Sequence, residues 1–426
     1  MNTRLMPAST SRRENKPANI FDRLSRHGFL ARMKKLQHGE IILEENGNKT
    51  RFGQITKQCP LSVSISVKNP QFYSDIAFGG SVAAGESYFQ HRWDCDNLTS
   101  LVRILLQNRE VLDGMDGHMA RVREPVYKIL HWLNRNTRSG SRRNIEAHYD
   151  LGNDLFSLFL DSNMMYSCAV YEKPEYTLEQ ASAAKLERIC RKLDLKSSDH
   201  VLEIGTGWGG FALYAAQHYG CKITTTTISQ EQYALAKQRV KEAGLTDQVT
   251  VLCEDYRDLT GQYDKLVSIE MIEAIGHQYM PTYFKQCSRL LKPEGMMLLQ
   301  AITISDQRYQ SALRSVDFIQ RYIFPGSFIP SISAMTDAVA QHTDMCLFNL
   351  EDIGPHYATT LQHWRERFFE RIDEVQSLGY SKQFIRLWEF YLCYCEGGFL
   401  ERAIGDVHML LVKPQCRRAA LTTSLE

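Results

Sequence analysis

The spacing of apolar positions changes along the chain, and each change predicts a different kind of structure. Between residues 199 and 304, short apolar runs alternate with stretches of helical spacing. The expected strands are 201–204, 223–228, 249–252, 265–269 and 296–304, and the expected helices are 211–218, a helix that starts at 229, and 279–291. This alternation favours an α/β fold in which helices cover both faces of a parallel sheet.

Other spacings flank this central part. From Ile41 to Phe89 the pattern is mostly period two, which is typical of half-buried strands, with Asn46-Gly47, Asn69-Pro70 and Gly79-Gly80 as turns. A helix is expected over 97–106, so residues 21–118 read as a small α+β domain. After residue 305 the chain becomes largely helical and rich in aromatic residues, and it closes with a strand at 407–412.

Composition limits the number of domains, the partners and the cellular location that we expect. The chain has 426 residues, 43% of them apolar, and a formal net charge of +1, which favours two or three domains and argues against a nucleic-acid partner. Residues 1–20 are polar and basic, so we expect a disordered tail there and no secretory signal. No apolar run approaches the roughly 20 residues needed to span a bilayer. The eleven cysteines are scattered without disulfide or zinc spacing, so we expect a cytoplasmic protein with no metal.

A basic stretch separates the N-terminal part from the rest. Residues 121–143 hold seven basic side chains and one acid. We assign 119–143 to a linker, 144–414 to a catalytic domain and 415–426 to a second tail. The linker is either a solvated hinge or a patch for anionic lipid headgroups, where each basic residue adds about 1 kcal/mol.

The glycine-rich turn after the first central strand points to a nucleotide-like ligand. Glu203, Gly205, Gly207 and Gly209 form an E-x-G-x-G-x-G sequence that opens a helix. Glycines allow a tight turn and a close approach of the backbone to a ligand. The spacing differs from the G-x-G-x-x-G of dinucleotide sites and favours S-adenosylmethionine, although a tight turn without a ligand is an alternative.

Further cofactor-binding candidates follow the next two strands. The second strand lacks the ribose-binding carboxylate of a dinucleotide site, and we expect Thr227 and Gln232 to take over part of this role, although Ser229 and Gln232 also cap a helix. Asp255 follows the third strand, where it could accept a hydrogen bond from the adenine amino group. We also expect its neighbour Tyr256 to belong to the cofactor-binding site.

Several segments in order resemble the cyclopropane-fatty-acyl-phospholipid synthase family of S-adenosylmethionine-dependent enzymes. The resemblance runs from about residue 20 to 414, and the segments that carry it are 80–88, 93–98, 144–153, 165–168, 269–276, 322–326, 356–357 and 394–399. It implies a class I methyltransferase (Rossmann-like) fold with a helical, aromatic-rich insertion for a lipid pocket. It also implies a reaction in which a methylene is added across a cis double bond of a phospholipid acyl chain.

The resemblance also implies roles for individual residues. The family's base is a bound bicarbonate ion. Carried over by position, Glu273 and Tyr357 match side chains around it, and Cys168 and Ile302 match positions that offer backbone groups. Cys395 matches an active-site cysteine, with a buried structural thiol as the alternative. For Glu273 the alternative is an acid that favours a helix N-terminus.

Two segments are expected to cover the cofactor. Tyr166 and Ser167 match positions that close over it, and 144–153 is expected to form a lid helix. His148 in that segment is more consistent with a hydrogen-bonded structural residue than with a base.

One residue departs from the family pattern. Gln300 stands where many bacterial members carry histidine, and an amide can hydrogen-bond bicarbonate but cannot carry its proton. Proton loss from another carbon would leave a methylated or methylene-branched chain, so a lipid C-methyltransferase without ring closure is the runner-up.

Two further hypotheses belong to other classes. A small-molecule N- or O-methyltransferase would need neither the N-terminal domain nor the aromatic C-terminal part. A lipid-binding protein with vestigial catalysis would not need the glycine turn with Glu273 and Tyr357. We therefore expect an enzyme acting on unsaturated phospholipid, bound peripherally to the inner face of the membrane, with the N-terminal domain as a possible homodimer contact.

Overall fold

The computed structural model describes residues 19–111, 136 and 152–421, and these form two compact units. The first is built from described residues of 1–134, 312–325 and 364–403, and the second from those of 135–311, 326–363 and 404–426. Most of the predicted linker 119–143 and of the predicted lid 144–153 lies outside the described residues, as does His148.

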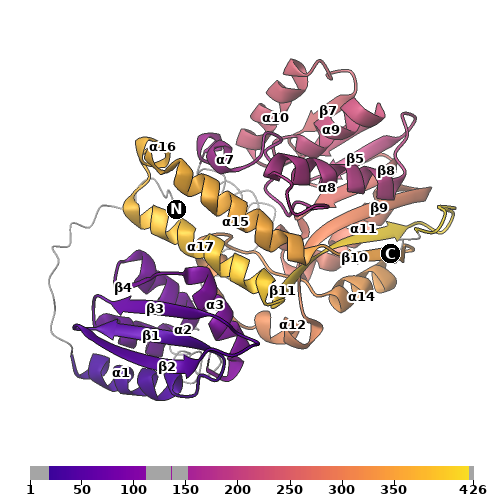
Figure 1. The fold of residues 1–426 in the computed structure, drawn as a ribbon. Coiled ribbons are helices and arrows are strands. Elements are labelled where there is room, and N and C mark those ends of the chain that lie inside the picture. The colour runs from indigo at the N-terminus through magenta and orange to yellow at the C-terminus, as the bar shows by residue number, and fades with distance from the viewer. Residues whose placement is uncertain (1–18, 112–135, 137–151, 422–426) are drawn as a thin grey trace. The chain divides into compact units, whose positions relative to one another are not determined.

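The second unit is built on a seven-stranded sheet of order β10-β11-β9-β8-β5-β6-β7 (Figure 1). Its strands are β5 (His200–Ile204), β6 (Lys222–Thr226), β7 (Val249–Leu252), β8 (Tyr263–Ile269), β9 (Leu291–Ile304), β10 (Cys346–Asp352) and β11 (Ile404–Val412). The five strands from β9 to β7 pair in parallel, while β10 and β11 join in antiparallel fashion. The carboxyl ends of β5 and β8 therefore meet at one edge of the sheet.

Helices flank this sheet. They are α7 (Asn153–Phe159), α8 (Leu178–Leu193), α9 (Gly210–Tyr219), α10 (Gln230–Glu242), α11 (Met280–Leu290), α12 (Asp306–Ala312), α14 (Ile332–His342), the first part of α15 (Gly354–Glu370), and the short 3-10 turns η3 (Ile272–Ala274) and η4 (His277–Tyr279). Fully buried side chains from helices and strands, among them Leu186, Phe211, Val267 and Leu298, share one apolar core. Burial of this apolar surface is the main force that holds the layers together.

The predicted strands and helices of residues 199–304 are confirmed, with boundaries shifted by a few residues. Ser229 caps α10 as expected, because its hydroxyl accepts from the backbone N–H of Gln232 at 3.3 Å. The stretch after residue 305 also holds a strand, β10, which we expected to be helical. Its apolar residues are partly exposed at the edge of the sheet, so their spacing gave no clear strand signal.

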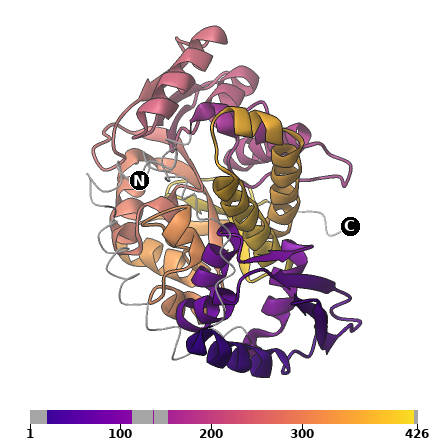
Figure 2. The same cartoon turned by 90° about the vertical axis from the view of Figure 1, so that its left-hand side faces the viewer.

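The first unit has a smaller sheet of order β2-β1-β3-β4. Its strands are β1 (Gly39–Glu45), β2 (Asn48–Gln54), β3 (Ser62–Val67) and β4 (Trp93–Cys95). Its helices are α1 (Ile20–Met33), α2 (Gln71–Phe89), α3 (Leu98–Gln107), α13 (Phe318–Tyr322), the end of α15, α16 (Ile372–Ser377) and α17 (Lys382–Leu400). The yellow helix α17 packs against α2 and α3, drawn in indigo to purple (Figures 1 and 2).

The period-two prediction for residues 41–89 is correct for β1 to β3 but wrong for 71–89, which form helix α2. Gly79-Gly80 does not join two strands. Instead, Gly80 adopts φ 56° and ψ −144° and kinks the helix. Small residues also let other helices approach α2, since a Cβ on Gly85 would lie 2.5 Å from the ring of Phe318. Tertiary packing thus outweighs the local pattern in this segment.

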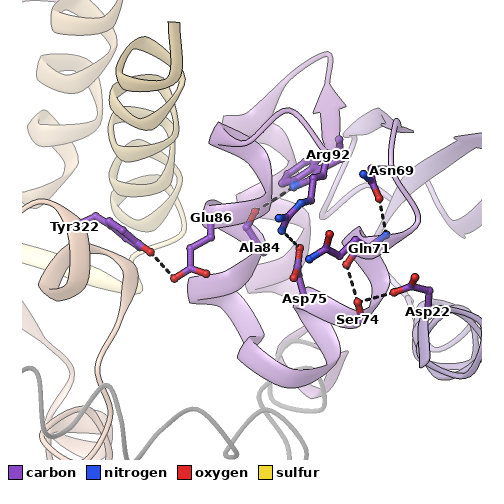
Figure 3. Close-up of polar contacts among 10 residues, drawn as sticks. Asp22, Asn69, Gln71, Ser74, Asp75, Ala84, Glu86, Arg92 and Tyr322 are labelled. Atoms are coloured by element: carbon purple, nitrogen blue, oxygen red, sulfur yellow. Dashed lines mark hydrogen bonds and ion pairs between the residues drawn. The ribbon is translucent and has the colours of Figure 1, made fainter. Parts of the chain in front are cut away.

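Polar contacts tie the separate segments of the first unit together (Figure 3). Ser74 on α2 donates to Asp22 on α1 at 2.7 Å, and Arg92 forms an ion pair with Asp75. Tyr322 on α13 donates to Glu86 on α2. Residues 312–325, which we expected to belong to the catalytic domain, therefore contact the N-terminal elements.

The same grouping holds for residues 364–403, where Arg365 and Thr99 both bind the buried carboxyl of Glu396. The division of the chain into domains at 21–118 and 144–414 stays a prediction. No helix in the described ranges is long and apolar enough to cross a bilayer.

Candidate active site

The turn between β5 and α9 depends on glycine at three positions. Gly205, Gly207 and Gly209 adopt φ values of 101°, 51° and 87°, a region that residues with a Cβ enter at a cost. The N–H groups of Gly205 and Thr206 both donate to the carbonyl of Thr226, at 3.0 Å each, which fixes the turn to β6. A Cβ on Gly207 would meet no described atom within 4 Å. The backbone at this residue therefore faces open space, as a ligand-binding turn must.

Glu203 lies beneath this turn. Its carboxyl accepts a hydrogen bond from the hydroxyl of Thr225 at 2.6 Å, and the same hydroxyl is 2.7 Å from that of Thr206. Only 2% of Glu203 is exposed, and burial raises its pKa to about 8. The contacts give Glu203 a bracing role in the turn, and its contact with a cofactor stays a prediction.

Thr227 and Gln232 lie together at the end of β6. The hydroxyl of Thr227 donates to the Gln232 side-chain oxygen at 2.8 Å, and both residues are buried. Since Gln232 also provides the backbone N–H that Ser229 caps, the capping alternative is confirmed. Its side-chain amide nitrogen is not used in either contact, which leaves a donor for a ligand.

Asp255 after β7 is paired with a cation. Arg257 donates to both carboxylate oxygens of Asp255, at 2.8 and 2.6 Å, and its guanidinium lies over the rings of Tyr256 and Tyr279. This bidentate pair fixes the carboxylate plane. The Oδ1 oxygen also accepts from the backbone N–H of Arg257 at 3.0 Å, so a contact of Asp255 with the adenine amino group stays a prediction.

Tyr166 and Ser167 contact α7 and α8, respectively. The ring of Tyr166 contacts Phe156 edge-on at 5.1 Å, and the hydroxyl of Ser167 accepts from the ammonium of Lys185 at 2.8 Å. Lys185 is fully buried, and desolvation lowers its pKa although Glu270 opposes this shift. Sequence reasoning missed Lys185, because its position within an amphipathic helix resembles an ordinary surface lysine.

Glu270 directly follows β8 and receives three hydrogen bonds. The donors are the backbone N–H of Cys168 at 2.8 Å, the side-chain amide of Gln300 at 2.7 Å and the hydroxyl of Tyr357 at 2.6 Å. The sequence analysis did not single out Glu270, although an acid at the carboxyl end of a parallel strand was an available signal.

Glu273 lies in η3, close to Glu270. One of its carboxylate oxygens accepts from the backbone N–H of Ile302 at 2.6 Å, and the other is buried with no partner in the described structure. Burial, and then the charge of Glu270, raise the pKa of Glu273 to about 8. The free oxygen gives this residue capacity for one more partner.

Asp406 and His408 complete the cluster from β11. The amide of Gln300 also donates to Asp406 at 3.0 Å, and its oxygen is 3.2 Å from the Nε2 atom of His408. Burial and the charge of Glu270 raise the pKa of Asp406 well above its usual range, while burial lowers that of His408. These shifts favour a protonated Asp406 and a neutral His408. Sequence analysis missed both residues, because only the antiparallel pairing of β11 with β9 brings them to Gln300.

The two predicted cysteines lie in different units. Cys168 in the second unit is fully buried, and desolvation raises its pKa well above its usual value, so it is a thiol. Cys395 on α17 belongs to the first unit, where burial and then Asp317 raise its pKa. A nucleophilic thiolate is favoured at neither position.

The donors expected for bicarbonate are engaged by the protein itself. The N–H of Cys168 and the hydroxyl of Tyr357 donate to Glu270, and the N–H of Ile302 donates to Glu273. Gln300 donates to Glu270 and Asp406. A second anion beside Glu270 would lack these donors and would be repelled, so the side chains present do not fit bound bicarbonate.

The sheet, the glycine turn and the position of the cluster define a class I S-adenosylmethionine-dependent methyltransferase. Solved structures support this class: the cyclopropane synthase MmaA2 from Mycobacterium tuberculosis is 30% identical with a TM-score of 0.60, covering 64% of this chain and 98% of that one. A complex of the mycolic acid cyclopropane synthase CmaA1 with SAH and CTAB is 28% identical with a TM-score of 0.59, covering 64% and 98%.

Sequence comparisons give the family. Residues 136–409 match the model of the mycolic acid cyclopropane synthetase family, and the chain belongs to this family. The chain is 41% identical to the tuberculostearic acid methyltransferase UfaA1 of M. tuberculosis, over 80% of this chain and 81% of the relative. It is 39% identical to the cyclopropane-fatty-acyl-phospholipid synthase of Escherichia coli K12, over 80% and 85%. The predicted family and fold class are therefore confirmed.

Proposed function

We propose that this chain transfers a methylene from S-adenosylmethionine to the cis double bond of an unsaturated phospholipid acyl chain and leaves a cyclopropane ring. The observation that carries the proposal is the enclosed acid cluster of Glu270, Glu273 and Asp406 next to the glycine turn. The turn lies close to the segment that carries Glu270 and Glu273, because a Cβ on Gly205 would lie 3.3 Å from the side chain of Met271.

The chemistry needs both features. The alkene is a weak nucleophile, so its carbon must be aligned with the sulfonium methyl at about 3–3.5 Å. The new C–C bond leaves a cation on the other alkene carbon, which water would capture unless the site excludes it. A base must then remove a proton. The carboxyl groups of this cluster supply candidates for the base, and the one that is ionised supplies a negative field for the cation.

The predicted site residues take roles within this proposal. Gly205, Gly207 and Gly209 shape the cofactor turn, with Tyr166, Ser167, Glu203, Thr227, Gln232, Asp255 and Tyr256 around the nucleoside. Glu273, Tyr357, Cys168, Gln300 and Ile302 belong to the reacting end. Cys395 stays a candidate of the first unit, with a structural thiol as the alternative.

The runner-up is a lipid C-methyltransferase that leaves a methylated or methylene-branched chain. Two observations favour it: the relative at 41% identity is named a methyltransferase, and Gln300 cannot relay a proton as a histidine would. All these products begin with the same methyl transfer and require the same site. The ring loses a proton from the added methyl directly and a methylene branch loses one there after a hydride shift, whereas a methylated alkene loses a proton from a chain carbon.

Three expectations about partners remain proposals. The first is bicarbonate as a bound base, although the donors around Glu270 are already engaged. The others are peripheral attachment to the inner face of the membrane without a spanning helix, and a homodimer formed through the N-terminal domain. Phospholipid substrate at a membrane surface follows from the proposed reaction.

Product analysis tests the proposal. Purified protein is incubated with S-adenosylmethionine and unsaturated phospholipid vesicles, and the fatty esters are analysed by mass spectrometry. We expect a gain of one CH2 unit that requires the cofactor and does not occur with saturated vesicles. Hydrogenation of the product then separates a ring from a methylene branch. If no unsaturated lipid gains mass while the cofactor binds, both candidate functions are wrong.

A further inference from the structure

The groups expected to hold a bound base already hold a side chain of the protein. Three donors from three separate elements converge on the carboxylate of Glu270: the Cys168 N–H, the Gln300 amide and the Tyr357 hydroxyl, at 2.6 to 2.8 Å. This is the arrangement in which a carboxylate, rather than a carboxylic acid, is stabilised.

The backbone also fixes Glu270. Its φ of 48° lies in the left-handed region, which is unusual for a residue with a Cβ, and its N–H donates to the carbonyl of Gln300 at 2.9 Å. The strained backbone and the three side-chain contacts hold the carboxylate in one orientation. Asp406 is fully buried, but part of Glu270 is accessible, so Glu270 is the member of the pair that a ligand can reach.

The charges around Glu270 favour one ionised carboxyl. Asp406 and Glu273 are the neighbouring acids, Lys185 is the buried base, and Tyr357 and Cys168 are the other titratable groups that face it. The Gln300 amide donates to both Glu270 and Asp406, so the two carboxyl groups are neighbours, and like charges at such close range cannot both ionise. Burial raises the pKa of Glu270 too, but the Tyr357 hydroxyl, the Cys168 N–H and Lys185 oppose this shift, so we place the proton on Asp406 and the negative charge on Glu270.

We propose that the carboxylate of Glu270, held by Tyr357, Gln300 and the Cys168 N–H, is itself the proton acceptor of the reaction in place of bound bicarbonate. This inference rests on the proposed function. Asp406 and Gln300 are then positioning residues.

The step balances without a further reactant. The alkene π pair forms a bond to the methyl carbon as the S–C pair returns to sulfur and leaves S-adenosylhomocysteine. Glu270 then takes a proton from the added methyl group, and the C–H pair closes the ring onto the cationic carbon. The carboxyl group becomes neutral and later gives its proton to solvent.

The test compares the wild type, Glu270→Gln and Glu270→Gly in buffer freed of carbon dioxide and in buffer with added bicarbonate. The wild type should make product at the same rate in both. Glu270→Gln should lose roughly 10²- to 10⁴-fold in rate, the usual contribution of a general base, in both buffers. Its residual product should contain more hydroxylated chain from capture of the cation by water, which a purely structural role would not produce.

Glu270→Gly frees the three donors and removes the strain at φ 48°, so this variant keeps the test valid if Glu270→Gln does not fold. Its rate should be low without bicarbonate and rise at least roughly tenfold with bicarbonate or formate, which can take the empty position. A line broadening of ¹³C-bicarbonate in NMR spectra should occur with Glu270→Gly and not with the wild type.

Glu294→Gln is the matched control, because this exposed acid lies near the start of β9, at the opposite end of the strand from Gln300. It should behave as the wild type, and all variants should keep their affinity for S-adenosylmethionine. A wild type that requires bicarbonate, or a Glu270→Gln variant of normal rate, would overturn the role of Glu270 alone. A wild type that modifies no unsaturated lipid would instead overturn the proposed function.

Discussion

A comparison of Gly207→Ala with Gly244→Ala separates the role of the glycine turn in cofactor binding from its role in folding. Gly207 adopts φ 51°, and Gly244, in the turn after α10, adopts φ 70°. A Cβ at either position meets no described atom within 4 Å, so neither alanine creates a clash within the described structure. Left-handed backbone costs a residue with a Cβ about 1–2 kcal/mol, and both variants should lose stability by similar amounts of this order.

The two variants should differ in cofactor affinity. If the backbone of Gly207 faces the nucleoside, its added methyl group occupies space that the ligand needs, and overpacking of this kind costs about 1–3 kcal/mol. This corresponds to a roughly 5- to 150-fold weaker Kd for Gly207→Ala and an unchanged Kd for Gly244→Ala. Isothermal titration with S-adenosylmethionine and S-adenosylhomocysteine measures both constants. Equal affinities of the two variants would refute the assignment of the open face of this turn to the cofactor.

Three further predictions concern the buried groups. Because burial raises the pKa of Glu203 from its usual 4.5 to about 8, the folded protein binds a proton that the unfolded chain lacks between these values, and stability falls as pH rises through this window. Glu203→Gln removes this loss, so the Tm of the variant relative to that of the wild type should increase from about pH 5 to about pH 8. A Tm difference that does not change with pH would contradict the burial of Glu203. Glu273→Gln should abolish turnover but keep cofactor affinity, because the amide oxygen can still accept from Ile302; a large loss of affinity in titration would contradict its place at the reacting end. Gly85→Ala should lower the unfolding free energy in urea by about 1–3 kcal/mol, and Phe318→Leu in the same chain should restore part of it; an additive loss would contradict their contact.

The central α/β part could be predicted from sequence because its signals are local. The apolar run before Gly205, the glycines themselves and the Ser229 cap each act within a few residues. In contrast, residues 71–89 follow a spacing that misled prediction, because the side chains of α2 are buried on most sides and show little helical periodicity.

The candidate site was predicted only in part for a similar reason. Glu273, Tyr357, Cys168, Gln300 and Ile302 came from the resemblance, and the structure brings them together. Glu270, Asp406, His408 and Lys185 were missed, because their contacts depend on strand pairing and on a helix packed against the sheet. A sequence pattern gives the chemistry of an acid but not the neighbours that decide its protonation.

One labelling measurement tests the central claim most directly. The protein is supplied with S-adenosylmethionine whose transferred methyl carries three deuterium atoms, together with unsaturated phospholipid vesicles, and the deuterium content of the modified acyl chain is read by mass spectrometry. Removal of a proton from the added methyl group predicts a product that keeps two of the three deuterium atoms. A product that keeps all three, or an acyl chain that gains no deuterium, would contradict the account.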